Sequence, residues 1–317
     1  MPGEPDDISG NLIKITDAPT YPVNGKLYIT SILVTNPDAP VFGAETIFNW
    51  MLGSNVVLPR EAVYPNKISP SQVESESAGE MKSSQSSATA AALRYLGYKV
   101  DEIYFVSSIR SYSKANKKLE DLDQIISIDG KVIKNVDEIR ASYANKKVGD
   151  SISITIERDD SDGNPIQKTF AIELVASQEP NAMQSPSEKP AIGILVGTAG
   201  KFPVDVNFNI EDVGGPSAGM IFAIGIVEKM TKEDLLRGRK VAGTGTISAN
   251  GKVGGIGGIQ EKLIGASRKG VSLFLAPKAN CPDITQVPKG MKVVPVTTLN
   301  EAISILRAPE NSKFPSC

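Results

Sequence analysis

Residues 214–230 constrain the fold most strongly. They open as G-G-P-S-A-G and continue into an uncharged apolar run over 220–227. We expect a strand before this segment, at 204–210, and an apolar helix over 216–230. The run is far shorter than the roughly 18 residues that a transmembrane helix needs. The segment therefore predicts an α/β domain in which a tight turn leads into a helix.

The rest of the chain alternates between strand and helix patterns. Short β-branched and apolar runs predict strands, and capped or amphipathic runs predict helices. The expected strands span 26–34, 102–107, 124–128, 151–157, 168–175, 191–196, 241–247 and 273–276. The expected helices span 44–52, 69–96, 137–144, 259–269 and 298–306. Short strands dominate from Tyr98 onward, which indicates a small separate domain in the middle of the chain.

The 317-residue chain contains no histidine. This absence excludes Ser-His-Asp and Cys-His catalysis, His-ligated zinc and the H-E-x-x-H protease helix. It also excludes the α/β-hydrolase interpretation of the G-P-S-A-G string, because that nucleophile elbow needs a histidine partner. Any general base must be Asp, Glu, Lys, Tyr or Cys.

Charge and cysteine content argue against further classes of partner and of structural site. The net charge of −2 gives no electrostatic case for a nucleic-acid or acidic-membrane partner. Cys281 and Cys317 are too few for a disulfide framework or a structural zinc site, and they leave the redox compartment open. The glycine runs at 243–258 contain neither G-x-x-x-x-G-K-[ST] nor G-x-G-x-x-G, so no nucleotide cofactor is expected. The first residues do not form a signal peptide, so either the protein is soluble or an upstream anchor is absent from this chain.

Ser217 is the first candidate for chemistry. At a helix N-terminus, free backbone N–H groups and the helix dipole stabilise negative charge. An acyl-transfer nucleophile and its oxyanion need this environment, and the backbone of Gly215, Pro216 and Ala218 would surround the oxyanion. The alternative is a serine that only caps the helix, and a lone G-x-S-x-G string favours that alternative.

Lys262 is the second candidate. On a helical wheel it shares one apolar side with Ile259, Leu263 and Ala266. Desolvation there would lower the lysine pKa from about 10.4, and a neutral lysine can accept the serine proton without any histidine. The alternative is a lysine that snorkels out at the edge of the stripe, and the helical period alone favours that alternative. Thr244 could orient the amine, although taken alone it is better explained as a β-prone residue in a strand.

Two further sets of side chains have simpler interpretations. Ser83, Ser84, Ser86 and Ser87 lie within the long predicted helix and indicate a small-residue packing face or a solvated face. Cys281 has no histidine to activate it, so we interpret it as a packed thiol rather than a nucleophile.

The motifs G-G-P-S-A-G-M, G-T-G-T-I and G-K-V-G-G-I-G-G-I-Q-E-K-L resemble the proteolytic domain of Lon-type Ser-Lys peptidases. They are most similar to the PDZ-containing Lon-like proteases of the YlbL type, which lack the ATPase module. The resemblance extends along nearly the whole chain. It assigns the nucleophile to Ser217, the general base to Lys262 and a supporting role to Thr244. ATP-dependent Lon enzymes commonly carry Asp at the position of Gly214. The resemblance therefore does not imply that a carboxylate controls the oxyanion region in this chain.

The segment L-E-D-L-D-Q-I-I-S-I-D-G at 119–130 resembles the L-x-x-G-D-x-I-x-x-V-D-G segment of bacterial protease PDZ domains, with Leu122 in place of the usual glycine. PDZ domains bind an extended peptide by strand addition and hold its terminal carboxylate with backbone N–H groups. The resemblance places this binding loop at Gly97, Tyr98, Lys99 and Val100, without a clear G-L-G-F motif.

The resemblance implies an α/β (α+β) Lon-type proteolytic domain that is discontinuous, with an inserted PDZ domain. The expected parts are an N-terminal tail (1–20), the first part of the protease domain (21–96), the PDZ domain (97–176), a linker (177–190), the second part of the protease domain (191–308) and a C-terminal tail (309–317).

The function implied is an ATP-independent Ser-Lys endopeptidase that acts on protein or peptide substrates and uses no metal, nucleotide or nucleic acid. The resemblance also implies ring-like homo-oligomers, and extracytoplasmic domains anchored to the cell membrane by an N-terminal segment that this chain does not show. The main alternative is a catalytically inactive PDZ/Lon-like adaptor that binds protein C-termini. A further alternative is a Ser-Lys amidase or esterase that does not cleave proteins.

Overall fold

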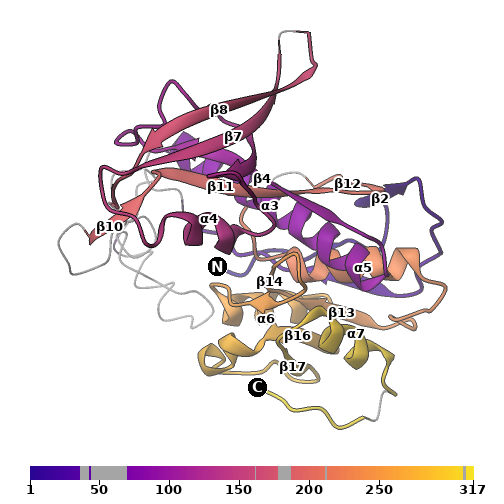
Figure 1. Ribbon diagram of the computed structural model, residues 1–317. Helices are drawn as coiled ribbons and strands as arrows, with labels where there is room; N and C mark the ends of the chain where they lie inside the picture. The colour runs from indigo at the N-terminus through magenta and orange to yellow at the C-terminus, as the bar shows by residue number, and fades with distance from the viewer. Residues whose placement is uncertain (36–42, 44–69, 161, 178–186, 211–212, 310–311) are drawn as a thin grey trace. The chain divides into compact units, whose positions relative to one another are not determined.

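The computed structural model describes residues 1–35, 43, 70–160, 162–177, 187–210, 213–309 and 312–317 (Figure 1). The chain divides into two compact units. The first combines Met1–Val100 with Phe202–Cys317, and the second is Asp101–Lys201. The helix expected at 44–52 lies outside the described residues. Within the described part of the chain, no helix has the length and apolarity needed to cross a membrane.

The first unit is built on a five-stranded sheet of order β1-β3-β13-β16-β17. Its strands are β1 (Asp6–Asp7), β3 (Lys26–Ile29), β13 (Lys240–Gly243), β16 (Leu273–Pro277) and β17 (Lys292–Val296). All neighbours pair in parallel except β1, which is antiparallel to β3. The parallel strands are short, mainly apolar runs, which is typical of strands covered on both faces.

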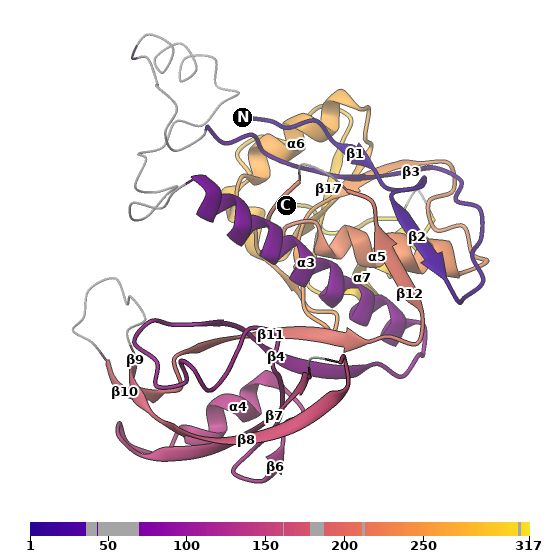
Figure 2. The ribbon, with the colours of Figure 1, turned by 90° about the horizontal axis from the view of Figure 1, so that it is seen from above.

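Helices cover both faces of this sheet. Because side chains alternate along a strand, Leu27, Val241 and Leu275 lie on one face, and Tyr28, Ala242 and Phe274 lie on the other. The first face packs against α3 (Pro70–Tyr95), α5 (Gly219–Met230) and α7 (Leu299–Arg307), and Figure 2 shows α3 alongside α5. The second face packs against α6 (Ile259–Arg268). The mixed α/β class predicted from the sequence is therefore confirmed.

Two small strand pairs complete the unit. β2 (Ile13–Thr16) pairs with β12 (Asp205–Phe208), and β14 (Thr246–Ile247) pairs with β15 (Val253–Gly254). The predicted strand over 241–247 is thus two short strands, β13 and β14, separated by Thr244 and Gly245.

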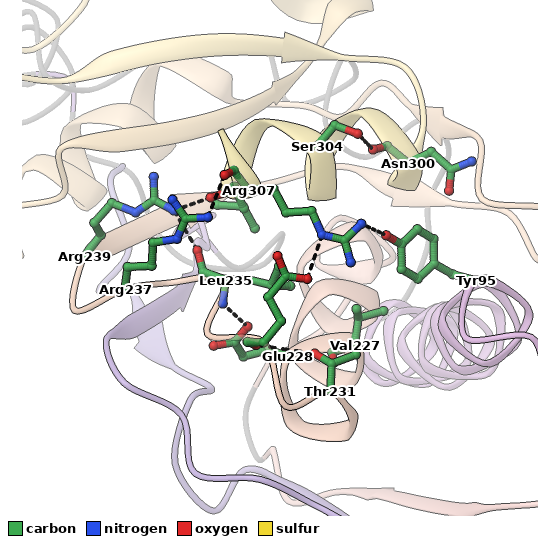
Figure 3. Close-up of polar contacts among 12 residues, drawn as sticks. Tyr95, Val227, Glu228, Thr231, Leu235, Arg237, Arg239, Asn300, Ser304 and Arg307 are labelled. Carbon is green, nitrogen blue, oxygen red and sulfur yellow. Dashed lines mark hydrogen bonds and ion pairs between the residues drawn. The ribbon is translucent and has the colours of Figure 1, made fainter. Parts of the chain in front are cut away.

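The last turn of α5 contains a buried carboxyl group, Glu228, which is only 3% exposed. Its Oε2 accepts a hydrogen bond of 3.0 Å from the backbone N–H of Leu235 (Figure 3). Burial, with smaller contributions from the Asp234 and Glu233 carboxylates, raises the pKa of Glu228 to about 7. Nearby, Arg307 donates hydrogen bonds of 2.8 Å to Glu233 and to the Tyr95 hydroxyl.

Replacing Glu228 with glutamine should stabilise the protein at pH 8. The native carboxyl keeps its proton up to about pH 7, whereas an unfolded glutamate loses it near pH 4.5. Stability therefore falls as the pH rises from about 4.5 to 7, by up to about 3 kcal/mol. Glutamine keeps an acceptor for Leu235 without this penalty. Calorimetric melting should show Glu228→Gln several degrees above wild type at pH 8 and close to it at pH 5.

Glu233→Gln is the matched control for this prediction. It removes a half-exposed ion pair with Arg307, and such pairs contribute about 0–1 kcal/mol. A Glu228→Gln variant that melts below wild type at pH 8 would contradict the prediction.

The second unit is an antiparallel sheet of order β11-β4-β5-β7-β8. Its strands are β4 (Asp101–Ile109), β5 (Gln124–Ile128), β7 (Ser151–Asp159), β8 (Pro165–Glu173) and β11 (Ile194–Lys201), with the short β6 (Lys131–Val132) paired to β5. The helix α4 (Val136–Tyr143) contributes Ile139 to a core rich in isoleucine from β5 and β7.

The turn before β5 has the geometry of a turn that usually contains glycine. Leu122 has a φ of 73° and its side chain is 77% exposed. A left-handed backbone costs a residue with a Cβ atom roughly 1–2 kcal/mol. The turn is held by Asp123, whose carboxylate accepts hydrogen bonds from the Glu120 N–H (2.8 Å) and from Arg158 (2.6 Å). These contacts maintain the turn although leucine replaces the glycine.

The second unit ends later than the sequence predicts. Residues 177–190 were expected to be a linker, and 191–196 a strand of the protease domain. Instead, β9 (Val175–Ser177) pairs with β10 (Ser187–Ala191), and β11 pairs with β4 along its whole length. This pairing places residues up to Lys201 in the second unit, so the expected boundaries at 176 and 191 are corrected. The pairing joins segments about 90 residues apart, which no local pattern reveals.

Candidate active site

Ser217 lies in a turn directly before α5. The helix was expected to begin at Pro216, but it begins at Gly219, with Ala218 as the N-cap residue. The N-cap has no side-chain hydrogen bond, so Ser217 does not serve as a helix cap. Its hydroxyl instead accepts a hydrogen bond from a lysine on another helix.

That lysine is Lys262, in the first turns of α6. Its Nζ lies 2.7 Å from Ser217 Oγ and 3.0 Å from Thr244 Oγ1. The side chain does not snorkel to solvent: Lys262 is 2% exposed, and its helix packs Ile259 and Leu263 into the same layer. Burial of the amine lowers its pKa from 10.5 to about 8. A substantial fraction of Lys262 is therefore neutral slightly above neutral pH.

Thr244 directly follows the last residue of β13. Its Oγ1–H donates a hydrogen bond of 3.0 Å to the Ser217 carbonyl, while the same oxygen accepts from Lys262. The backbone N–H of Gly245 donates to the same carbonyl at 2.7 Å. Thr244 and Gly245, at the carboxyl end of β13, therefore connect the Ser217 turn before α5 to Lys262 on α6. Functional sites are common at this end of the strands in parallel sheets.

This arrangement orients a neutral amine. The charged amine of Lys262 donates to both Ser217 Oγ and Thr244 Oγ1. Once the amine is neutral, an N–H that stays on Thr244 leaves the lone pair free to face Ser217 Oγ. A hydroxyl next to an unprotonated amine, with no histidine present, is a geometry suited to proton transfer from serine to lysine.

The expected oxyanion residues do not all offer a donor. The N–H of Gly215 is donated to the Ser77 carbonyl at 3.0 Å, and Pro216 has no N–H. Within the described residues, the N–H groups of Ser217 and Ala218 have no hydrogen-bond acceptor. These two groups are therefore the available donors, and the expectation for Gly215 and Pro216 is corrected.

Two of the expected peptide-binding residues, Gly97 and Tyr98, form the C-terminal end of α3. The N–H of Gly97 is donated to the Arg94 carbonyl at 3.0 Å, and the N–H of Tyr98 to the Leu93 carbonyl at 2.9 Å. Together with the φ of 85° at Gly97, these bonds form a helix C-cap.

Val100 is buried in an apolar cluster of the first unit. Lys99 lies between the helix end at Tyr98 and this cluster, in the same unit. The N–H groups of Gly97 and Tyr98 are therefore already used at the helix end. The peptide-binding role of residues 97–100 stays a prediction.

Sequence reasoning missed the residue that holds the loop before α6. Asn280, in the 3-10 helix η1 (Lys278–Asp283), accepts from the Ile256 N–H at 2.9 Å and donates to the Ile256 carbonyl at 2.8 Å. The neighbouring Cys281 forms a disulfide with Cys317, which corrects its interpretation as a packed thiol. No local signal reveals these pairings, because they join residues 24 and 36 positions apart.

Comparisons with known proteins match two kinds of domain in this chain. Residues 211–307 match the Lon protease (S16) C-terminal proteolytic domain, and residues 83–166 match the PDZ domain. A Lon protease of Neorickettsia sennetsu is 39% identical over 100 residues, 30% of this chain and 12% of that protein. A Lon protease of Endomicrobium trichonymphae is 31% identical over 138 residues, 42% of this chain and 17% of that protein. The alignments thus span less than a fifth of these relatives.

Solved structures of PDZ domains are also similar to part of this chain. The PDZ domain of the SdrC-like protein from Listeria monocytogenes is 26% identical, covers 31% of this chain and 90% of that chain, and has a TM-score of 0.25.

The α/β sheet, the serine turn and the family matches together define a protease domain. More specifically, this chain carries the C-terminal proteolytic domain of the Lon protease family together with a PDZ domain. Within the described residues, no group of three or more Cys, Asp or Glu side chains is placed to hold a metal ion.

Proposed function

We propose that the protein is a Ser-Lys endopeptidase that cleaves protein or peptide substrates. The observation that carries this proposal is the 2.7 Å contact between Lys262 Nζ and Ser217 Oγ at a buried site. The Lon-type protease domain supports the reaction class, and the PDZ domain supports a role for the second unit in binding or gating a peptide chain.

The reaction would follow the geometry. Ser217 Oγ attacks the scissile carbonyl carbon, and its proton passes to the neutral amine of Lys262. The negative oxygen of the tetrahedral intermediate accepts from the N–H groups of Ser217 and Ala218. Lys262 then gives the proton to the leaving amine, which leaves an acyl-enzyme. Water, deprotonated by the same amine, attacks the acyl carbon. The bond from that carbon to Ser217 Oγ then breaks, the carboxylic acid product leaves, and Lys262 returns the proton to Ser217 Oγ.

We further propose that this reaction is independent of ATP. Its proton transfers use only Ser217 and Lys262, with Thr244 orienting the amine, and no step needs a phosphate group. Cleavage of fluorescein-labelled casein should proceed at the same rate with and without Mg-ATP. A requirement for Mg-ATP would contradict this part of the proposal.

The function is tested by Ser217→Ala. This variant should lose casein cleavage and covalent labelling by a fluorophosphonate while its thermal melting is unchanged. Ser267→Ala, which removes only a local hydrogen bond on α6, should keep both. Undiminished cleavage by Ser217→Ala would overturn the proposal. An adaptor would show no labelling of the wild type, and an esterase would be labelled but cleave only small esters.

The rate should rise with pH around a midpoint of about 8. Below that value the native amine of Lys262 carries a proton and cannot accept one from Ser217; above it, the amine is neutral. The profile of kcat/KM on casein between pH 5.5 and 9.5 reports this group in the free enzyme. A rise centred near pH 4 instead would indicate a carboxylate base.

A further inference from the structure

A side chain of α3 outside the predicted site contacts the serine turn. Ser84 lies on α3 and is only 5% exposed. Its Oγ–H donates a hydrogen bond of 3.0 Å to the Pro216 carbonyl, 132 residues further along the chain. The sequence predicts no role for the serines of this helix beyond packing or solvation.

The contact determines the orientation of the first peptide group at the serine. A peptide bond is planar and here trans, so its C=O and N–H point in opposite directions. The Pro216 carbonyl accepts the shorter hydrogen bond from Ser84 and a longer one of 3.5 Å from the Gly219 N–H. Because Ser84 holds this carbonyl, the N–H of Ser217 in the same peptide group is directed away from α3. This N–H is one of the two available oxyanion donors.

The next peptide group, between Ser217 and Ala218, is held by two residues that follow β13. Thr244 and the Gly245 N–H hold the Ser217 carbonyl at 3.0 and 2.7 Å, which directs the N–H of Ala218 away from β13. Each of the two donors is therefore oriented through the carbonyl of its own peptide group. For the Ser217 N–H, the side chain that does this is Ser84.

The packing around Ser84 leaves little freedom for its hydroxyl. A Cβ atom added to Gly219 would lie 2.7 Å from Ser84 Oγ and 3.0 Å from Ile247 Cγ2, so the glycine allows the two helices to approach at this point. On the remaining side Ser84 lines a hollow of about 160 Å³, together with Glu80, Ser83, Ser87, Pro216, Thr246 and Ile247.

We infer that Ser84 is a positioning residue for the oxyanion donor: its hydrogen bond to the Pro216 carbonyl aims the Ser217 N–H at the developing negative oxygen. This inference rests on the proposed peptidase function. Because Ser84 acts through a peptide group and not on the proton transfer, its loss should lower kcat while KM and the pH midpoint set by Lys262 stay unchanged.

The test compares Ser84→Ala with wild type on fluorescein-labelled casein. We expect kcat to fall about tenfold, less than the roughly 10²–10³-fold loss when an oxyanion donor itself is removed. KM, the pH midpoint near 8 and the melting temperature should be those of wild type. Ser83→Ala and Ser87→Ala, which line the same hollow, should retain wild-type kcat.

A matched pair covers the case in which alanine disturbs the fold. Ser84→Thr and Ser84→Val differ by the hydroxyl alone in nearly the same shape, so threonine should be about tenfold faster than valine. Equal kcat for threonine and valine, or wild-type kcat for Ser84→Ala, would overturn the inference. If Ser217→Ala also retains cleavage, the proposed function has failed; if it is inactive, only the role of Ser84 has failed.

Discussion

Replacing Lys262 with methionine should lower casein cleavage by about 10³- to 10⁴-fold, since general acid–base catalysis contributes on this scale. Methionine fills similar space on α6 but cannot accept the proton of Ser217. The residual rate should also lose its rise near pH 8. Initial rates between pH 6 and 9.5 measure both effects.

The same substitution should stabilise the protein at neutral pH. Below pH 8 the native amine is charged in a buried environment, whereas the unfolded lysine has a pKa near 10.5. The native state therefore carries a desolvation penalty that disappears only as the pH rises from about 8 to 10.5. Removing the amine should raise the free energy of unfolding at pH 7 by up to about 3 kcal/mol. A variant that is both inactive and more stable shows that lost activity is not lost folding.

Two controls sharpen this experiment. Lys269→Met removes a half-exposed lysine at the end of the same helix, paired with Glu4, and should leave rate and melting nearly unchanged. The double variant Ser217→Ala, Lys262→Met should be no slower than Ser217→Ala alone, because two residues that act as one unit do not contribute additively. A Lys262→Met enzyme that keeps its rise near pH 8 would exclude Lys262 as the base.

Thr244→Val should slow cleavage by about 10- to 100-fold. The substitution removes a hydrogen bond to the Lys262 amine and one to the Ser217 carbonyl, and bonds to a charged group contribute about 1.5–3 kcal/mol. The Thr244 oxygen favours the protonated amine by accepting from it. Without that acceptor the Lys262 pKa should fall further, so the pH midpoint should move below 8. The rate should still drop, because the amine is no longer oriented toward Ser217.

Thr244→Ser keeps the hydroxyl and is the matched variant. It should retain most of the rate and a midpoint near 8, measured in the same pH series as Thr244→Val. A Thr244→Val enzyme whose midpoint moves to higher pH would show that Thr244 does not accept from the amine in the free enzyme.

The sequence predicts the parts of this protein that depend on local patterns. The all-apolar run of α5 could only be a buried helix in this setting, and the stripe shared by Ile259, Lys262 and Leu263 predicts which face of α6 is covered. The zero histidine count excluded a histidine base, but it was the resemblance to Lon-type peptidases that named Lys262. Residue type and helical period therefore predicted the elements and the covered face of α6, but not the choice of base.

The parts that depend on tertiary packing were not accessible. The start of α5 moved by three residues because the turn at Ser217 is held by β13 and α3, not by its own sequence. The contact of Ser84 with Pro216 and the pairing of β11 with β4 join distant segments. Gly97 shows a different difficulty. A glycine at this position is typical of a helix end and also of a binding loop, so the sequence does not distinguish the two.

The discontinuous first unit has a consequence for the order in which the protein forms during synthesis. The second unit is one continuous segment, 101–201, and can fold as soon as it is made. β3 must wait for β13, and the Thr30 hydroxyl bonds a carbonyl 213 residues later. Lys262 is made later still. Because Ser217 meets Lys262 only when this sheet is complete, the proposed peptidase stays inactive on the ribosome until Lys262 and the strands that follow it have been made.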